Sequence, residues 1–245
     1  MKLISLFALM GLSISVFAQE IKLNPFQWTM TDVASRGLTK ETLFKGMDTD
    51  FVKTKSSICS NRALMWANDF KRDHNLDTGK IFIFFTEKKN DDIKFKVWWY
   101  HVAPIINENG NIWVVDAGFQ GRNGINEPRT KEDWMKYFNQ GQVCREIKPH
   151  ETELIELMFS QQTYPKYTAY GNHPCYYMIV PHTIWTPNVL AQSLLGKDAS
   201  GKPVRVERPA IVQRELMEAC VEAAAGKIGR VFGSSKKKCE EYVAK

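Results

Sequence analysis

The feature of this sequence that most constrains its fold is the dipeptide Asn109-Gly110. Asn-Gly is the strongest signal for a two-residue β-hairpin turn, because both central residues of that turn need positive φ angles. The dipeptide lies within residues 94–119, where β-branched and aromatic residues occur on both sides of it. We therefore predict two antiparallel strands joined at this turn.

The turn also predicts which residues face each other across the hairpin. If it has two residues, Glu108 pairs with Asn111, and Ala103 pairs with Asp116 further along the ladder. His101 lies two residues from Ala103 and therefore shares its face of the sheet. His101 and Asp116 then become diagonal neighbours on one face, within reach of a hydrogen bond.

Pro104 lies in the first predicted strand and complicates this register. Proline has no N–H group to donate to a ladder, so we expect the first strand to be locally at an edge, or bulged, at this position. A one-residue bulge would turn His101 and Asp116 to opposite faces. Taken singly, His101 could also be an ordinary core histidine and Asp116 an ordinary strand-end aspartate.

A helix is predicted to begin near Cys59 and to end near Asp73, with Ser56 or Ser57 as its N-cap. The unpaired N–H groups and the positive dipole end of a helix N-terminus stabilise an anion, so a thiol there becomes a better nucleophile. The alternative is an inert cysteine on a buried helix face. Helical spacing puts four residues on that face: Cys59, Ala63, Trp66 and Phe70.

The first residues, 1–18, have the pattern of a secretory signal peptide. Lys2 supplies the positive charge, residues 3–16 are apolar, and Val16 and Ala18 fit a small-residue cleavage site after Ala18. No later run is long and apolar enough to span a bilayer. We expect a protein that is secreted or periplasmic.

Export changes how the five cysteines are interpreted. An oxidising compartment favours disulfides, and an odd count leaves one thiol unpaired. Four cysteines can pair in three ways, and we favour the two bridges that each close a modest loop. These are Cys144–Cys175 and Cys220–Cys239, which leave Cys59 as the free thiol.

Composition places the chain among ordinary folded domains. Hydrophobic residues make up 44% of the sequence and charged residues 24%, while the net charge is +6. No basic stripe interleaved with aromatics is present, so nucleic-acid binding is not expected. With no repeat or long linker, we predict one monomeric α+β domain over residues 19–245, with its core at about 55–120 and a disulfide-stapled region at 144–245.

A metal site is not expected. His173, Cys175 and His182 match no standard zinc spacing, and Cys175 is assigned to a disulfide. The chemistry that the other candidate residues support requires no metal and no cofactor.

Cys59, His101 and Asp116 together have the composition of a Cys-His-Asp triad. Cys59 would attack a carboxamide or peptide carbonyl, His101 would move the proton, and Asp116 would orient the imidazole. Water or an amine would resolve the thioester, and the backbone N–H of Cys59 would supply one oxyanion donor. Three tryptophans are candidates for lining the substrate groove, with core packing as the alternative: Trp98, Trp99 and Trp113.

These motifs resemble those of the secreted bacterial protein-glutaminases. Residues 59–63 (CSNRA) look like the Cys-x-x-Arg-Ala motif of that family, and residues 98–104 (WWYHVAP) are close to its Trp-x-Tyr-His-Val-Ala-Pro. Residues 115–119 (VDAGF) stand where the family has Asp followed by Pro and a hydrophobic residue, although Ala117 replaces the proline. The order of Cys, His and Asp is the same.

The resemblance covers residues 55–120 or thereabouts, and it implies a fold and an activity. The fold is a transglutaminase-like, papain-related core, in which a nucleophile at a helix N-terminus packs against an antiparallel sheet carrying His and Asp. The activity is deamidation of glutamine side chains in proteins or peptides to glutamate, with release of ammonia. The triad carries over as nucleophile Cys59, base His101 and orienting acid Asp116.

Three other functions fit the same residues. A transglutaminase would pass the thioester to a lysine, and a cysteine peptidase would attack the main chain instead. A disulfide-stabilised binding protein without catalysis would keep Cys59 buried and unreactive. Thiol labelling separates the last class from the enzymes, and the reaction products separate the enzymes from one another.

Overall fold

The computed structural model describes residues 28–49, 58–85, 99–120, 124–139, 141–148, 150–160, 173, 175–189, 208–224 and 234–244. The predicted signal peptide, the expected caps Ser56 and Ser57, and Trp98 lie outside these residues. No helix in the described part of the chain has the length and apolar character needed to cross a bilayer.

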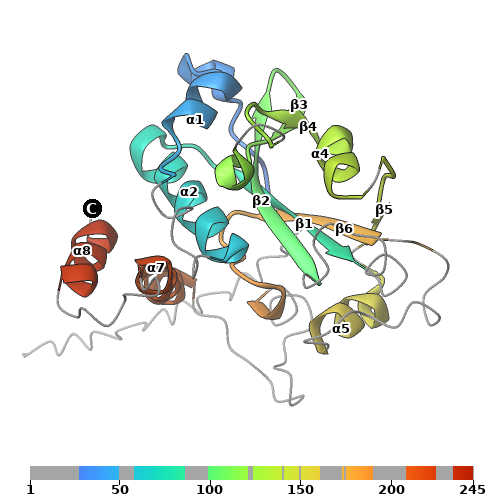
Figure 1. Cartoon of the computed structure of the whole chain (residues 1–245). Coiled ribbons are helices and arrows are strands. Elements are labelled where there is room, and N and C mark those ends of the chain that lie inside the picture. Colours follow the sequence, from blue (N-terminus) through green and yellow to red (C-terminus); the bar gives the residue numbers. More distant parts are fainter. Residues whose placement is uncertain are drawn as a thin grey trace, which may run out of the picture.

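A six-stranded sheet in the order β4-β3-β2-β1-β6-β5 forms the centre of the described structure (Figure 1). Neighbouring strands are antiparallel, except that β5 and β6 run parallel. The strands are β1 (Gly79–Phe85), β2 (Tyr100–Glu108), β3 (Asn111–Val114), β4 (Arg129–Thr130), β5 (Arg145–Glu146) and β6 (Cys175–Pro181).

Helices surround this sheet and give a mixed α+β architecture, as the sequence predicted. Helix α2 contacts β2 and α7, and α8 packs on α7 (Figure 1). The helices are η1 (Val33–Arg36), α1 (Lys40–Gly46), α2 (Cys59–His74), η3 (Ala117–Phe119), α4 (Lys131–Phe138), α5 (Thr152–Ser160), α7 (Arg208–Ala224) and α8 (Ser234–Val243).

The core lies on both faces of the sheet because β1 is apolar at every position from Ile81 to Phe85. Ile81 and Ile83 of β1 belong to one buried cluster, whereas Phe82 and Phe84 belong to a second. Alternate residues of a strand point to opposite faces, so both faces are covered. A third apolar cluster joins α2 to α7 and α8.

The predicted hairpin and its register are present. Asn109 has φ 53° and Gly110 has φ 81°, the positive values that the two-residue turn requires. Glu108 pairs with Asn111, and the ladder continues in the same register to the pairing of Ile105 with Val114.

The bulge considered at Pro104 is absent, whereas the local edge expected there is present, because β3 ends opposite it. Strand β2 lies between β1 and β3, and Pro104 pairs with Lys80 in a continuous register. Its carbonyl accepts a hydrogen bond from Val115 N at 3.0 Å, so its missing N–H would also have pointed towards β3. Because β3 ends at Val114, the proline removes only a bond at the end of that ladder.

The predicted N-cap of the cysteine-bearing helix is wrong. Helix α2 begins at Cys59, its N-cap is Ile58, and no side chain caps it. The serines lie too far upstream to serve, because the cap must immediately precede the first helical residue. Cys59 therefore occupies the first helical position.

Two disulfides tie the second half of the chain together. Cys144 is bonded to Cys175 at the start of β6, with Cα atoms 4.8 Å apart. Cys220 on α7 is bonded to Cys239 on α8, with Cα atoms 5.7 Å apart. These are the pairings that the loop lengths favoured, and Cys59 is free.

Gly110→Ala is expected to destabilise the protein by about 1 kcal/mol, because alanine is strained at positive φ. Gly46→Ala is the matched control, since neither glycine has an atom within 4 Å of its missing Cβ and Gly46 lies in a helix at an ordinary φ. We expect the control to be stabilised by about 0.5 kcal/mol. Urea denaturation measures both changes, and an unchanged midpoint for Gly110→Ala would contradict the turn geometry.

Candidate active site

The hairpin register brings His101 and Asp116 together. His101 lies on β2, and Asp116 follows β3 as the N-cap of η3. The distance between His101 Nε2 and Asp116 Oδ2 is 2.8 Å, and both side chains are buried. This is the diagonal contact that the turn predicted, and it leaves Nδ1 as the ring nitrogen that is not engaged by Asp116.

Asp116 is held by further donors. The indole Nε1 of Trp134 donates to Oδ2 at 2.9 Å, and the backbone N–H of Gly118 donates to Oδ1 at 3.2 Å. Burial would raise the pKa of Asp116, but the charge and hydrogen bond of His101, the hydrogen bond of Trp134 and the charge of Arg62 outweigh it, so the pKa is lowered. The carboxylate is therefore ionised and fixed in orientation.

His101 is enclosed by aromatic rings. Its ring centroid lies 5.0 Å from that of Phe119, 5.5 Å from that of Trp134 and 4.7 Å from that of Phe138. Burial alone would lower the pKa of His101, but the charge and hydrogen bond of Asp116, followed by Cys59, raise that pKa to about 9. The imidazole is therefore protonated at neutral pH.

Cys59 lies at the first position of α2, half-buried, and contacts His101. Burial would raise the pKa of its thiol. The hydrogen bond and charge of His101, the charge of Arg62 and a hydrogen bond from the Val102 backbone outweigh burial, so the pKa is lowered. Cys59 and His101 thus favour a thiolate–imidazolium ion pair.

The end of β3 at Val114 explains why a backbone N–H is available to the Cys59 thiol. Along a strand, every second N–H points to the same side. The carbonyl of Pro104 faces β3, so the N–H of Val102 faces that side too, beyond Val114 where β3 has ended. The Val102 N–H is consequently available to Cys59, where a longer β3 would have used it.

The three predicted groove tryptophans have different positions. Trp99 is partly buried, packs with Cys59 against the same apolar cluster, and lies 6.3 Å from Phe84 between ring centroids. Trp113 on β3 is partly buried, with the Lys40 ammonium 4.4 Å from its ring centroid. Trp98 falls outside the described residues.

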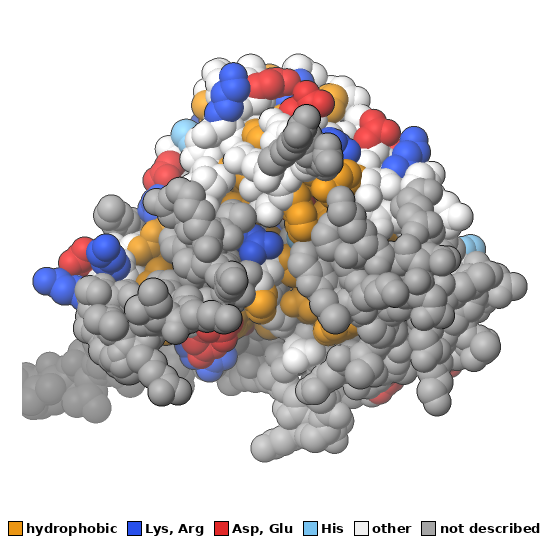
Figure 2. All heavy atoms as spheres, viewed as in Figure 1, with side chains coloured by type: hydrophobic (Ala, Val, Ile, Leu, Met, Phe, Trp, Pro, Cys, Tyr) orange, Lys and Arg blue, Asp and Glu red, His pale blue; other side chains and the backbone are white. Residues whose placement is uncertain are grey.

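An exposed apolar side chain directly precedes the thiol in the chain. Ile58, which immediately precedes Cys59, is 48% exposed. Figure 2 shows hydrophobic side chains gathered in the middle of the viewed face, with a basic side chain among them. A substrate that reaches Cys59 would therefore meet apolar surface at Ile58.

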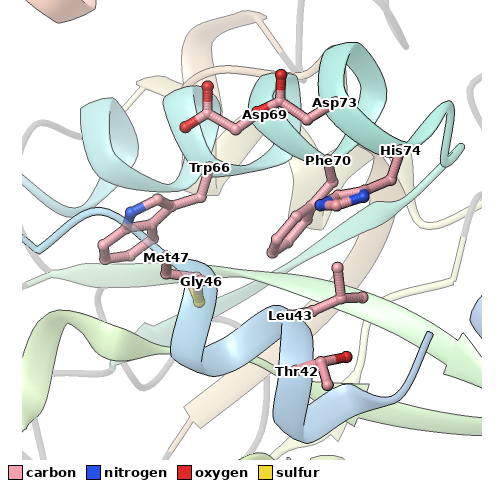
Figure 3. Close-up of a pocket in the computed structure, with 9 residues that line it drawn as sticks. All are labelled: Thr42, Leu43, Gly46, Met47, Trp66, Asp69, Phe70, Asp73 and His74. Carbon is pink, nitrogen blue, oxygen red and sulfur yellow. The ribbon is translucent and has the colours of Figure 1, made fainter.

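A small cavity of about 50 Å³ lies elsewhere, between α1 and α2 (Figure 3). Trp66, Phe70 and His74 point towards α1, whereas Asp69 and Asp73 point away from it. None of the three triad residues lines this cavity, so it is not part of the candidate site. Its lining is Thr42, Leu43, Gly46, Met47, Trp66, Asp69, Phe70, Asp73 and His74.

Trp134 is a residue of this site that no sequence motif marks. Its contact with Asp116 does not follow from local patterns, because helix α4 reaches the hairpin only through tertiary packing. Arg62 is another residue of this site, which the sequence shows only as the arginine of the Cys-x-x-Arg-Ala motif. Within the described residues, no group of His, Cys, Asp and Glu could hold a metal ion.

Comparison with known families bears directly on this geometry. Residues 39–138 match the family model described as Glutaminase. The predicted resemblance to the protein-glutaminases is thereby confirmed for this segment, which contains Cys59, His101, Asp116 and Trp134. No curated protein matches the chain. A solved structure similar to it is the NMR structure of protein-glutaminase from Chryseobacterium proteolyticum, at 14% identity and a TM-score of 0.39, covering 79% of this chain and 86% of that one.

Asp116→Asn is expected to lower the pKa of His101 from about 9 by one unit or more, because it removes the main group that raises that pKa. Proton NMR titration of the imidazole measures the change. Asp133→Asn is the control, since Asp133 is an exposed acid bonded to Thr130 at the start of α4 and should leave the titration unaltered. A His101 titration that is the same in Asp116→Asn as in the wild type would contradict the assigned contact.

Proposed function

We propose that the protein is an exported protein-glutamine deamidase with Cys59, His101 and Asp116 as its catalytic triad. It would hydrolyse glutamine side-chain amides in proteins or peptides to glutamate and ammonia. The observation that carries this proposal is the contact of Cys59 with the buried His101–Asp116 pair, which lies within the segment that matches the Glutaminase family.

In the first half of the proposed reaction, the Cys59 thiolate attacks the amide carbon and the carbonyl oxygen becomes an oxyanion. The Cys59 backbone N–H, at the start of α2, is available to bind that oxyanion. Protonated His101 gives its proton to the amide nitrogen, and the C–N bond breaks to release ammonia. A thioester to Cys59 and a neutral imidazole remain.

In the second half, His101 acts as the base. It takes a proton from water, the resulting hydroxide adds to the thioester carbon, and the C–S bond breaks to release glutamate and the thiolate. Asp116 keeps Nε2 occupied throughout, so the proton moves through Nδ1. The cycle returns to the ion pair and consumes one water for each ammonia released.

Transglutaminase and cysteine peptidase remain the alternatives within the enzyme class, because they form the same kind of thioester or acyl-enzyme. A lysine amine in place of water would give a crosslink, and a main-chain amide in place of a side-chain amide would give chain cleavage. The family match favours the deamidase. A non-catalytic binding protein is disfavoured by the ion pair, which a structural cysteine does not need.

Export, a single catalytic domain over residues 19–245 and a monomeric state are parts of the same proposal. The two disulfides support export, because such bonds persist in oxidising compartments. The apolar contacts among α2, α7 and α8 support treating both halves as one unit. The reaction as written requires no cofactor and no metal.

The decisive assay incubates the protein with an unfolded glutamine-containing protein and measures ammonia, crosslinks and cleavage in the same sample. We expect ammonia with the mass change of an amide-to-acid conversion, without crosslinks or cleavage. Cys59→Ala should lose activity by about 10⁴-fold, because it removes the nucleophile. His74→Ala, at the far end of α2 from Cys59, is the control and should keep wild-type activity. Equal ammonia from wild type and Cys59→Ala would rule out the proposed mechanism.

The rate should be highest while Cys59 is a thiolate and His101 is protonated. Above about 9, the pKa of His101, the imidazole loses the proton that the leaving ammonia needs, so the rate should fall. Below the lowered pKa of Cys59, the thiolate is protonated and the rate should fall again. Initial rates from pH 3 to 10 would measure both limbs. A rate that rises steadily through about pH 8.5, as for an unperturbed thiol, would contradict the ion pair.

A further inference from the structure

Arg62 is a buried cation at the centre of the candidate site. It lies three residues after Cys59 on α2, so the two side chains share one side of the helix. Arg62 is only 7% exposed. A guanidinium is retained in such a place only where opposite charge compensates the loss of water.

Gly118 locates the guanidinium relative to Asp116. A Cβ atom on Gly118 would lie 3.1 Å from Arg62 Nε, 3.2 Å from Arg62 Nη2 and 3.2 Å from Asp116 Oδ1. The guanidinium and the carboxylate therefore border the same small space, which a side chain would fill. Gly118 also donates its N–H to that carboxylate oxygen, so the backbone of η3 lies against both groups.

The position of Arg62 matters for the charge balance of the site. The Cys59 thiolate and the Asp116 carboxylate are two anions, and His101 supplies only one cation. A buried cluster with an unbalanced charge is costly, and the thiolate could avoid that cost by taking up a proton. Arg62 makes the cluster neutral, and its charge acts on both Cys59 and Asp116.

We propose that Arg62 is a positioning residue that keeps Cys59 ionised and Asp116 in place, and that position 118 is glycine because the guanidinium borders the space a side chain would need. This inference rests on the proposed function for its role in catalysis, but not for its effect on the thiol. Since Arg62 is buried and its guanidinium lies beside Gly118 and Asp116, it acts through the triad rather than by binding substrate.

Two other titratable groups near Cys59 are Tyr100 and Glu222. Tyr100 on β2 is kept neutral, because burial and the Cys59 charge raise its pKa above the usual range. Glu222 on α7 accepts a hydrogen bond from Asn61 at 2.8 Å and faces that amide. His101 is present in every variant considered below, so a change in the thiol is attributable to Arg62.

The test measures alkylation of Cys59 by iodoacetamide between pH 4 and 9, read by mass spectrometry. Cys59 is the one cysteine outside the two disulfides, so the rate reports this thiol alone. Arg62→Met and Arg62→Gln remove the charge and should shift the alkylation midpoint upwards by about one pH unit, which slows alkylation by about tenfold at pH values below the wild-type midpoint. Arg62→Lys retains the charge and should stay nearer to the wild type. Arg36→Met, on exposed η1, is the control.

Two uncharged variants keep the proposal open to refutation if one of them fails to fold. Circular dichroism selects the folded variants. A folded Arg62→Met or Arg62→Gln with the wild-type alkylation profile would overturn the proposal, and so would an Arg62→Lys shift as large as that of Arg62→Met. Where deamidation is measured, the uncharged variants should lower kcat and leave KM unchanged. Absence of deamidase activity in the wild type would count against the proposed function, whereas the alkylation profile would still decide the role of Arg62.

Discussion

The buried hydrogen bond between His101 and Asp116 is the interaction on which the candidate site depends. It joins two groups that would each be costly to bury alone. Aromatic rings surround the pair, and the indole of Trp134 donates a further hydrogen bond to Asp116. The two-residue turn at Gly110 is the local cause, since it sets the register that places the two side chains on one face. One residue of slippage would separate them.

The site forms at the place where the sheet stops being regular. Strand β3 ends at Val114, and the chain turns into η3 just where Pro104 offers no N–H for further pairing. Proline would weaken an ordinary central strand, but here it lies where the pairing of β2 with β3 ends. The nearby N–H of Val102 has no partner in β3 and donates a hydrogen bond to Cys59 instead.

Residues in the second half of the chain form hydrogen bonds with α2, the helix that begins at Cys59. Asn61 donates to Glu222 on α7 and accepts from the indole of Trp185, while Tyr242 on α8 donates to Asp69 at 2.8 Å. These bonds attach α2, the helix that begins at Cys59, to α7, to α8 and to Trp185. The Cys220–Cys239 bridge joins α7 and α8. Residues outside the segment that matches the Glutaminase family thus contact and support that segment.

The sequence alone determined the features that follow from local rules: the turn, the register between His101 and Asp116, the helix start near Cys59 and the favoured disulfide pairs. Each depends on φ preferences, strand alternation or counting along the chain. Tertiary structure decided the rest. Pro104 entered a central strand, and Trp134 and Arg62 came to lie close to Asp116, because these contacts join elements distant in sequence. The N-cap at Ile58 differs from the expected serines for a local reason, since the cap must directly precede Cys59. No periodicity encodes which helix packs against which strand end, and the charge balance of a buried cluster exists only once the cluster has formed.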